Sequence, residues 1–124
     1  MNRFPRLLAA ACVVSFVTAA QAADKPFDAK ALARYDASYV QCEASFPEMK
    51  GHRDDAYLSL WRVKPGAKAT SRLAAARGSA PYKAEHRLAT ARQTSQAAQP
   101  EAVKAVERQC RGLWGEHERA KAGK

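Results

Sequence analysis

The chain has 124 residues, a formal net charge of +9 and 47% hydrophobic residues, a size that fits one small domain and leaves no room for a second. Isoleucine is absent and alanine is the most frequent residue, so the composition excludes a large aliphatic core and favours helices. No segment alternates β-branched and polar residues over several positions, which argues against a β-sheet.

The first 22 residues have the three parts of a bacterial export signal in the required order. Arg3 and Arg6 give a positive start, residues 7–20 an apolar segment, and residues 20–22 an Ala-Gln-Ala cleavage site. The apolar segment is shorter than the roughly 20 residues that span a bilayer, so we expect cleavage after residue 22 rather than retention as a membrane anchor. Lipidation of Cys12 is an alternative, because residues 8–12 resemble a lipobox, although the mature chain would then begin with an apolar run.

Cleavage leaves one mature domain, residues 23–124, which loses the two arginines of the signal and keeps a formal net charge of +7. We expect this domain in the periplasm or outside the cell. Its first helix is predicted from about Asp28, a favourable N-cap, to Phe46, which precedes a helix-ending proline. The apolar residues of this helix recur at spacings of three and four, which places them on one face: Leu32, Tyr35, Tyr39, Cys42 and Phe46.

Three shorter helices are predicted in the middle of the chain. An aromatic segment that starts at residue 54 or 55 and ends at Val63 forms the first, and Lys64-Pro65-Gly66 stops it. Residues 67–77 and 81–95 form an alanine-rich pair, divided by a turn at residues 78–81. We expect shallow burial of this pair, because only three large apolar side chains occur between residues 67 and 99: Leu73, Tyr82 and Leu88.

The last helix is predicted from Pro100, and residues 119–124 are expected to fray. It repeats the spacing of three and four with Val103, Val106, Cys110, Leu113 and His117. A cationic His117 would suit the negative C-terminal end of this helix.

The two cysteines of the mature chain, Cys42 and Cys110, each lie within an apolar helical stripe. In an oxidising compartment, an even pair in a short chain favours a disulfide over a free catalytic thiol or two buried thiols. Metal binding is disfavoured, because zinc sites use closely spaced pairs. The sequence therefore predicts an all-α bundle of four or five helices whose first and last helices are joined by a Cys42–Cys110 disulfide.

Positive charge is concentrated in the middle of the chain. Residues 64–99 carry seven basic residues against Glu85 alone. We take six of the seven as candidate residues for binding an anion or a partner: Lys68, Arg72, Arg77, Lys83, Arg87 and Arg92. Export removes nucleic acid from the expected partners and leaves an acidic protein or an anionic component of the envelope. The alternative interpretation is that these side chains only keep an alanine-rich helix pair soluble.

Catalytic and cofactor motifs are absent from the sequence. It contains no H-x-x-x-H, no G-x-S-x-G, no glycine-rich phosphate loop and no C-x-x-C-H. We therefore expect neither an enzyme nor a metal or cofactor protein. The favoured hypothesis is an exported helical binding protein, for example an inhibitor or immunity protein acting on an acidic partner. The second hypothesis is a periplasmic chaperone-like or envelope-stress protein that binds unfolded clients or anionic envelope surfaces.

Overall fold

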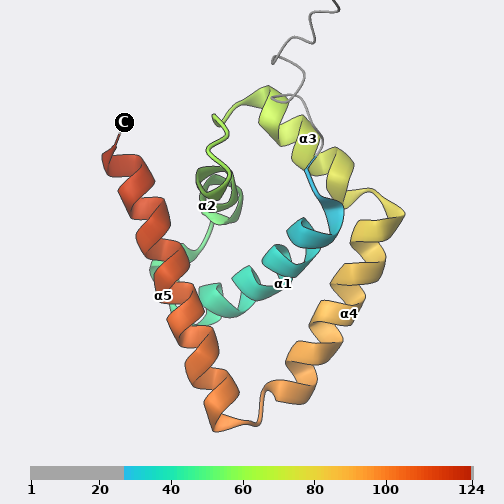
Figure 1. Ribbon diagram of the computed structural model, residues 1–124, viewed down its shortest axis with the longest axis vertical. Coiled ribbons are helices and arrows are strands. Elements are labelled where there is room, and N and C mark those ends of the chain that lie inside the picture. Colours follow the sequence, from blue (N-terminus) through green and yellow to red (C-terminus); the bar gives the residue numbers. More distant parts are fainter. Residues whose placement is uncertain (1–26, 124) are drawn as a thin grey trace, which may run out of the picture.

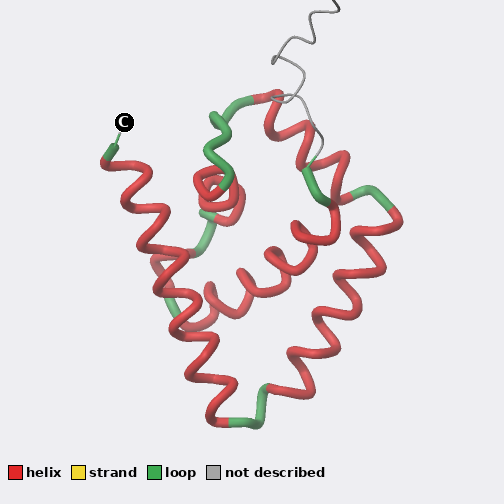
Figure 2. The backbone as a smooth tube through the Cα atoms, viewed as in Figure 1, coloured by secondary structure: helices red, strands yellow, loops and turns green. Residues whose placement is uncertain are grey.

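The computed structural model describes residues 27–123, and every regular element in this part of the chain is a helix (Figures 1 and 2). The elements are α1 (Ala29–Ser45), η2 (Pro47–Met49), α2 (Arg53–Leu60), α3 (Ala67–Arg77), α4 (Ala80–Gln96) and α5 (Pro100–Ala122). The all-α prediction with its disulfide between the first and last helices is confirmed. The predicted export signal and the alternative lipidation site at Cys12 lie outside the described residues.

α1 is the central helix and packs against α3, α4 and α5. Figure 1 shows α4 and α5 as two arms that enclose α1 and meet at the turn before Pro100. α1 and α4 run in the same direction, because Arg34 in the first half of α1 reaches Glu85 in the first half of α4. The C-terminal parts of the two helices line one groove, together with the start of α5.

Helix boundaries follow local capping chemistry. The Asp28 side chain accepts a hydrogen bond from the backbone N–H of Ala31 at 3.0 Å, which confirms its predicted role as N-cap of α1. Ser79 caps α4 in the same way through the backbone N–H of Tyr82. α5 continues to Ala122, so the structure keeps residues 119–122 helical where the composition favoured fraying.

α2 ends at Leu60, three residues before the predicted end at Val63. The backbone N–H of Val63 donates to the carbonyl of Leu58 at 2.9 Å, and that of Arg62 donates to Ser59 at 3.2 Å. This pair of bonds is a Schellman motif, which requires a left-handed residue at the position that Arg62 occupies with φ 53°. Glycine is the usual residue there, whereas this chain has Arg62 at the position and its next glycine only at Gly66, so the motif was not predictable from the sequence.

The core consists of two clusters joined by Tyr35. One cluster lies between α1, α2 and α3 and contains Leu32, Tyr57, Leu58, Ala69, Leu73 and Ala76. The other surrounds the disulfide and contains Tyr39, Cys42, Met49, Ala56 and Cys110. The expected shallow burial of the alanine-rich pair holds for α4, in which only Ala89 of 17 residues is buried, but is wrong for α3, which places Ala69, Leu73 and Ala76 in the core.

Candidate functional site

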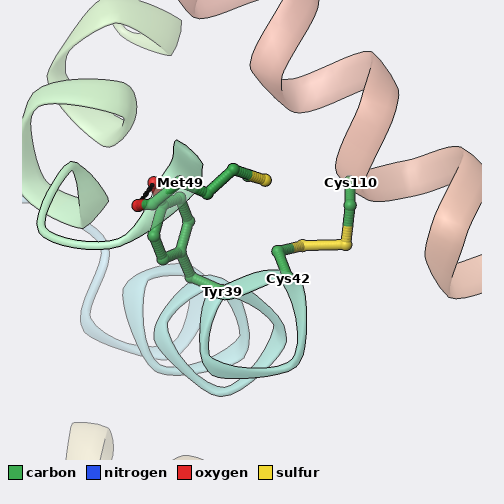
Figure 3. Close-up of a disulfide and its surroundings, with 4 residues drawn as sticks. All are labelled: Tyr39, Cys42, Met49 and Cys110. Carbon is green, nitrogen blue, oxygen red and sulfur yellow. Dashed lines mark hydrogen bonds between the residues drawn. A yellow bond between two sulfur atoms is a disulfide. The ribbon is translucent and has the colours of Figure 1, made fainter. Parts of the chain in front are cut away.

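The disulfide clamps the last turn of α1 to the centre of α5. Cys42 and Cys110 are each 1% exposed, and their Cα atoms are 5.4 Å apart. Figure 3 shows Tyr39 and Met49 beside the bridge, with the Tyr39 hydroxyl donating to the Met49 carbonyl at 2.6 Å. Burial raises the pKa of Tyr39 to about 12. The thiols are consumed in a structural bond, so neither cysteine serves as a nucleophile.

A buried carboxylate, Asp36, joins α1 to two other helices. Asp36 is 1% exposed and accepts two hydrogen bonds from the Arg77 guanidinium of α3, at 2.8 and 3.0 Å. It also accepts the Tyr82 hydroxyl of α4 at 2.5 Å. Burial and the bond to Asp36 raise the pKa of Tyr82 to about 12. This arrangement compensates the buried negative charge with one bidentate cation and one hydroxyl.

The same arginine extends the network to α2. Arg77 Nη2 donates to Asp54 Oδ1 at 2.7 Å, and Arg53 Nε donates to the same oxygen at 3.2 Å. Burial opposes both charges, but the hydrogen bonds outweigh it, so the pKa of Arg77 is raised and that of Asp54 is lowered. Arg77 was a candidate for binding a partner from the sequence. In the structure its guanidinium is used to hold α1, α2 and α3 together.

The two α3 candidates occupy different settings. Arg72 is half-buried, and its guanidinium lies 4.3 Å from the centre of the Phe27 ring. A cation over an aromatic face is a packing contact that also keeps its charge at the surface. Lys68 lies at an exposed position one turn earlier in α3.

The three α4 candidates are exposed but do not share one face of the helix, since Arg92 lies nine residues after Lys83 and so about half a turn around the helix from it. Lys83 and Arg87 are exposed, lie one turn apart and make no ion pair with the described residues. Arg92, 55% exposed at its side chain, contacts Glu85 at 3.2 Å. Arg34 of α1, which was not among the candidates predicted from the sequence, contacts the same Glu85 oxygen at 3.3 Å. We call this region the α4 surface, made by Arg34, Lys83, Arg87, Leu88 and Arg92.

The histidines near α5 form a second polar cluster. His117 is 4% exposed, and its ring contacts those of Trp114 and His52, with centroids 5.0 and 6.1 Å away. Its Nδ1 lies 3.1 Å from the Ser59 hydroxyl, which donates its own proton to the Asp55 carbonyl. Nδ1 therefore carries the proton and donates to Ser59. Burial, helped by Lys121, lowers the pKa of His117, so the expected cationic histidine is corrected to a neutral, buried one.

Other classes of site find no support in the described part of the chain. Residues 27–123 contain no group of three or more His, Cys, Asp or Glu side chains placed to hold a metal ion. Among the helices of this span, none is long and apolar enough to cross a membrane. Comparisons with protein families, characterised proteins and solved structures find no match to this chain.

Proposed function

We propose that this protein is an exported binding protein of the inhibitor or immunity type, which uses the α4 surface to bind an acidic partner protein. The main support for the proposal is the charge balance around Glu85, because two cations, Arg34 and Arg92, pair with this one carboxylate. The chain has no other acidic residue between positions 64 and 99. The α4 surface therefore keeps an excess of positive charge that can steer and hold an acidic surface.

The packing of α4 supports the same proposal. Since Ala89 alone is buried, nearly the whole outer side of this helix is open to a partner without rearrangement of the core. Leu88 is 56% exposed, directly follows Arg87 and lies one turn before Arg92. Protein interfaces commonly surround an apolar contact with arginines, and this helix presents both.

A charge reversal with a matched control tests the proposal. The Lys83→Glu/Arg87→Glu variant inverts two exposed cations one turn apart on α4. Its control, Lys104→Glu/Arg108→Glu, inverts two exposed cations at the same spacing on α5. We expect cross-linking in a periplasmic extract to capture one stoichiometric partner at moderate salt. The α4 variant should bind it at least tenfold more weakly, about 1.4 kcal/mol, and the control should bind normally. Equal binding by both variants would contradict the proposal.

The exposed apolar side chains give the chaperone-like alternative weaker support. Five large hydrophobic side chains are among the exposed residues: Val40, Leu60, Trp61, Leu88 and Val103. They come from α1, the end of α2, α4 and α5, and this distribution is unlike the contiguous apolar patch that binding of unfolded chains requires. Suppression of aggregation of unrelated proteins, unchanged in the α4 variant, would favour the chaperone over the inhibitor.

A further inference from the structure

A cleft of about 810 Å³ lies between the segment that follows α2 and the last turns of α5. This volume falls within the range of small-molecule sites, about 300–1,000 Å³. The lining combines apolar side chains, Leu58, Val63 and Ala120, with three cations, Arg62, Lys64 and Arg119. The cleft shares no residue with the α4 surface.

The charges of this cleft do not cancel. Glu116 is the one acidic residue of the lining, and it forms an ion pair with Arg119 three residues later. Arg62 and Lys64 are exposed and form no ion pair with the residues that the structure describes. Two uncompensated cations therefore face an apolar lining, which is a chemical match for a molecule with an anionic head and an apolar body.

The backbone at Arg62 adds an independent observation. Among residues 27–123, Arg62 is the one residue other than glycine with a positive φ. The Schellman end of α2 favours glycine there, because a Cβ atom disfavours the left-handed conformation. The chain thus keeps a long cationic side chain at a position where glycine would make the helix end more stable. Disfavoured backbone that carries a charged side chain into a cleft is typical of functional sites.

We propose that this cleft binds a small amphipathic anion, with a phosphate or carboxylate head held by Arg62 and Lys64 and an apolar body against Leu58, Val63 and Ala120. The inference is independent of the proposed function, because the two sites have different residues and different ligand classes. Effects on binding and on stability can be told apart at this residue. Arg62→Gly should remove the binding charge and also relieve the unfavourable left-handed conformation of the backbone. Few substitutions remove a binding group while favouring the fold.

The test uses calorimetric titration of the mature chain with three matched probes. Octyl phosphate carries both head and body, octyl glucoside replaces the charged head by a neutral one, and inorganic phosphate lacks the body. We expect saturable one-to-one binding of monomeric octyl phosphate, at least tenfold tighter than either control probe. Arg62→Gly should weaken this binding at least tenfold while the melting temperature stays equal or rises, and Lys64→Gln should weaken it without unfolding.

Control variants and a membrane arm complete the test. Lys104→Gln and Arg108→Gln remove exposed cations of α5 outside the cleft and should leave octyl phosphate binding unchanged. Equal affinity for octyl phosphate and octyl glucoside would overturn the proposal, as would wild-type affinity in Arg62→Gly. Binding to phosphatidylglycerol vesicles without binding to monomeric octyl phosphate would also overturn it, because a membrane surface would then replace the small molecule as ligand.

Discussion

Replacing Arg77 by methionine should destabilise the fold strongly, although the sequence alone places this arginine on a solvent-exposed helix. In the variant Asp36, 1% exposed, would lose both guanidinium bonds, 2.8 and 3.0 Å long. It would keep the Tyr82 hydroxyl and the more distant Arg53, 3.7 Å away. Removing one partner of a buried ion pair costs about 3–5 kcal/mol, because the remaining charge is left in a poorly solvated position.

The expected loss lies at the lower end of this range, about 3 kcal/mol, since the side chain of Arg77 is 19% exposed and water screens part of the pair. For a domain of this size it corresponds to a fall in melting temperature of about 12–24 °C. Urea and thermal unfolding at pH 7, followed by circular dichroism, measure both quantities.

The control for this experiment is Arg92→Met, which removes an exposed guanidinium 3.2 Å from Glu85. An exposed pair contributes less than about 1 kcal/mol, so this variant should unfold near the wild-type temperature. The Asp36→Asn/Arg77→Met double variant should be more stable than the sum of the single losses predicts, because it leaves no unpaired buried charge. Equal small losses for Arg77→Met and Arg92→Met, or strict additivity in the double variant, would refute this account of the buried network.

Three further predictions concern the disulfide, His117 and the export signal. Reduction should add two hydrogen atoms to the mass. It should also lower the free energy of unfolding by about 4 kcal/mol, because Cys42 and Cys110 close a loop of 68 residues. A mass that does not change on reduction would show that no disulfide joins α1 and α5. Folding lowers the pKa of His117 from 6.5, so stability should be greatest above this value and fall as the pH drops from it to the lower folded value. Urea midpoints at pH 7.5, 6.5 and 5.5 should show a smaller slope in His117→Gln, while His86→Gln, a partly exposed histidine, should retain the wild-type slope. Mass spectrometry of the protein from a periplasmic fraction should give Ala23 as the first residue, and an intact residue 1 would contradict the signal.

Features that repeat along one helix were predictable from the sequence. The spacing of three and four gave the core side of α1 and the disulfide, because a buried stripe needs only the geometry of a single helix. Helix caps and prolines act on residues close to them in the chain, so the starts of α1 at Asp28 and of α5 at Pro100 were also predictable.

Features that depend on distant pairs were not predictable in the same way. Arg77 is 41 residues from Asp36, and no periodicity connects them. One signal was present, since Asp36 falls one helical turn after Leu32 on the face that carries the core residues. A charge on a buried face requires a partner, and the nearby excess of arginines offered several. His117 was assigned to the apolar stripe correctly, but its neutral state depends on its burial beside Ser59 and Trp114.

The sparse anchoring of α4 has a consequence for how this protein can change over time. Tyr82, Glu85 and Ala89 attach one side of the helix to the rest of the domain. The opposite side is exposed and makes no contact within the described chain on which the fold depends. Substitutions on that outer side should therefore be nearly neutral for folding, within about 0.5 kcal/mol each. Folding therefore leaves the outer side of α4 free to change while it constrains α1, so any constraint on that outer side would come from the proposed partner, and it could change together with the partner's surface.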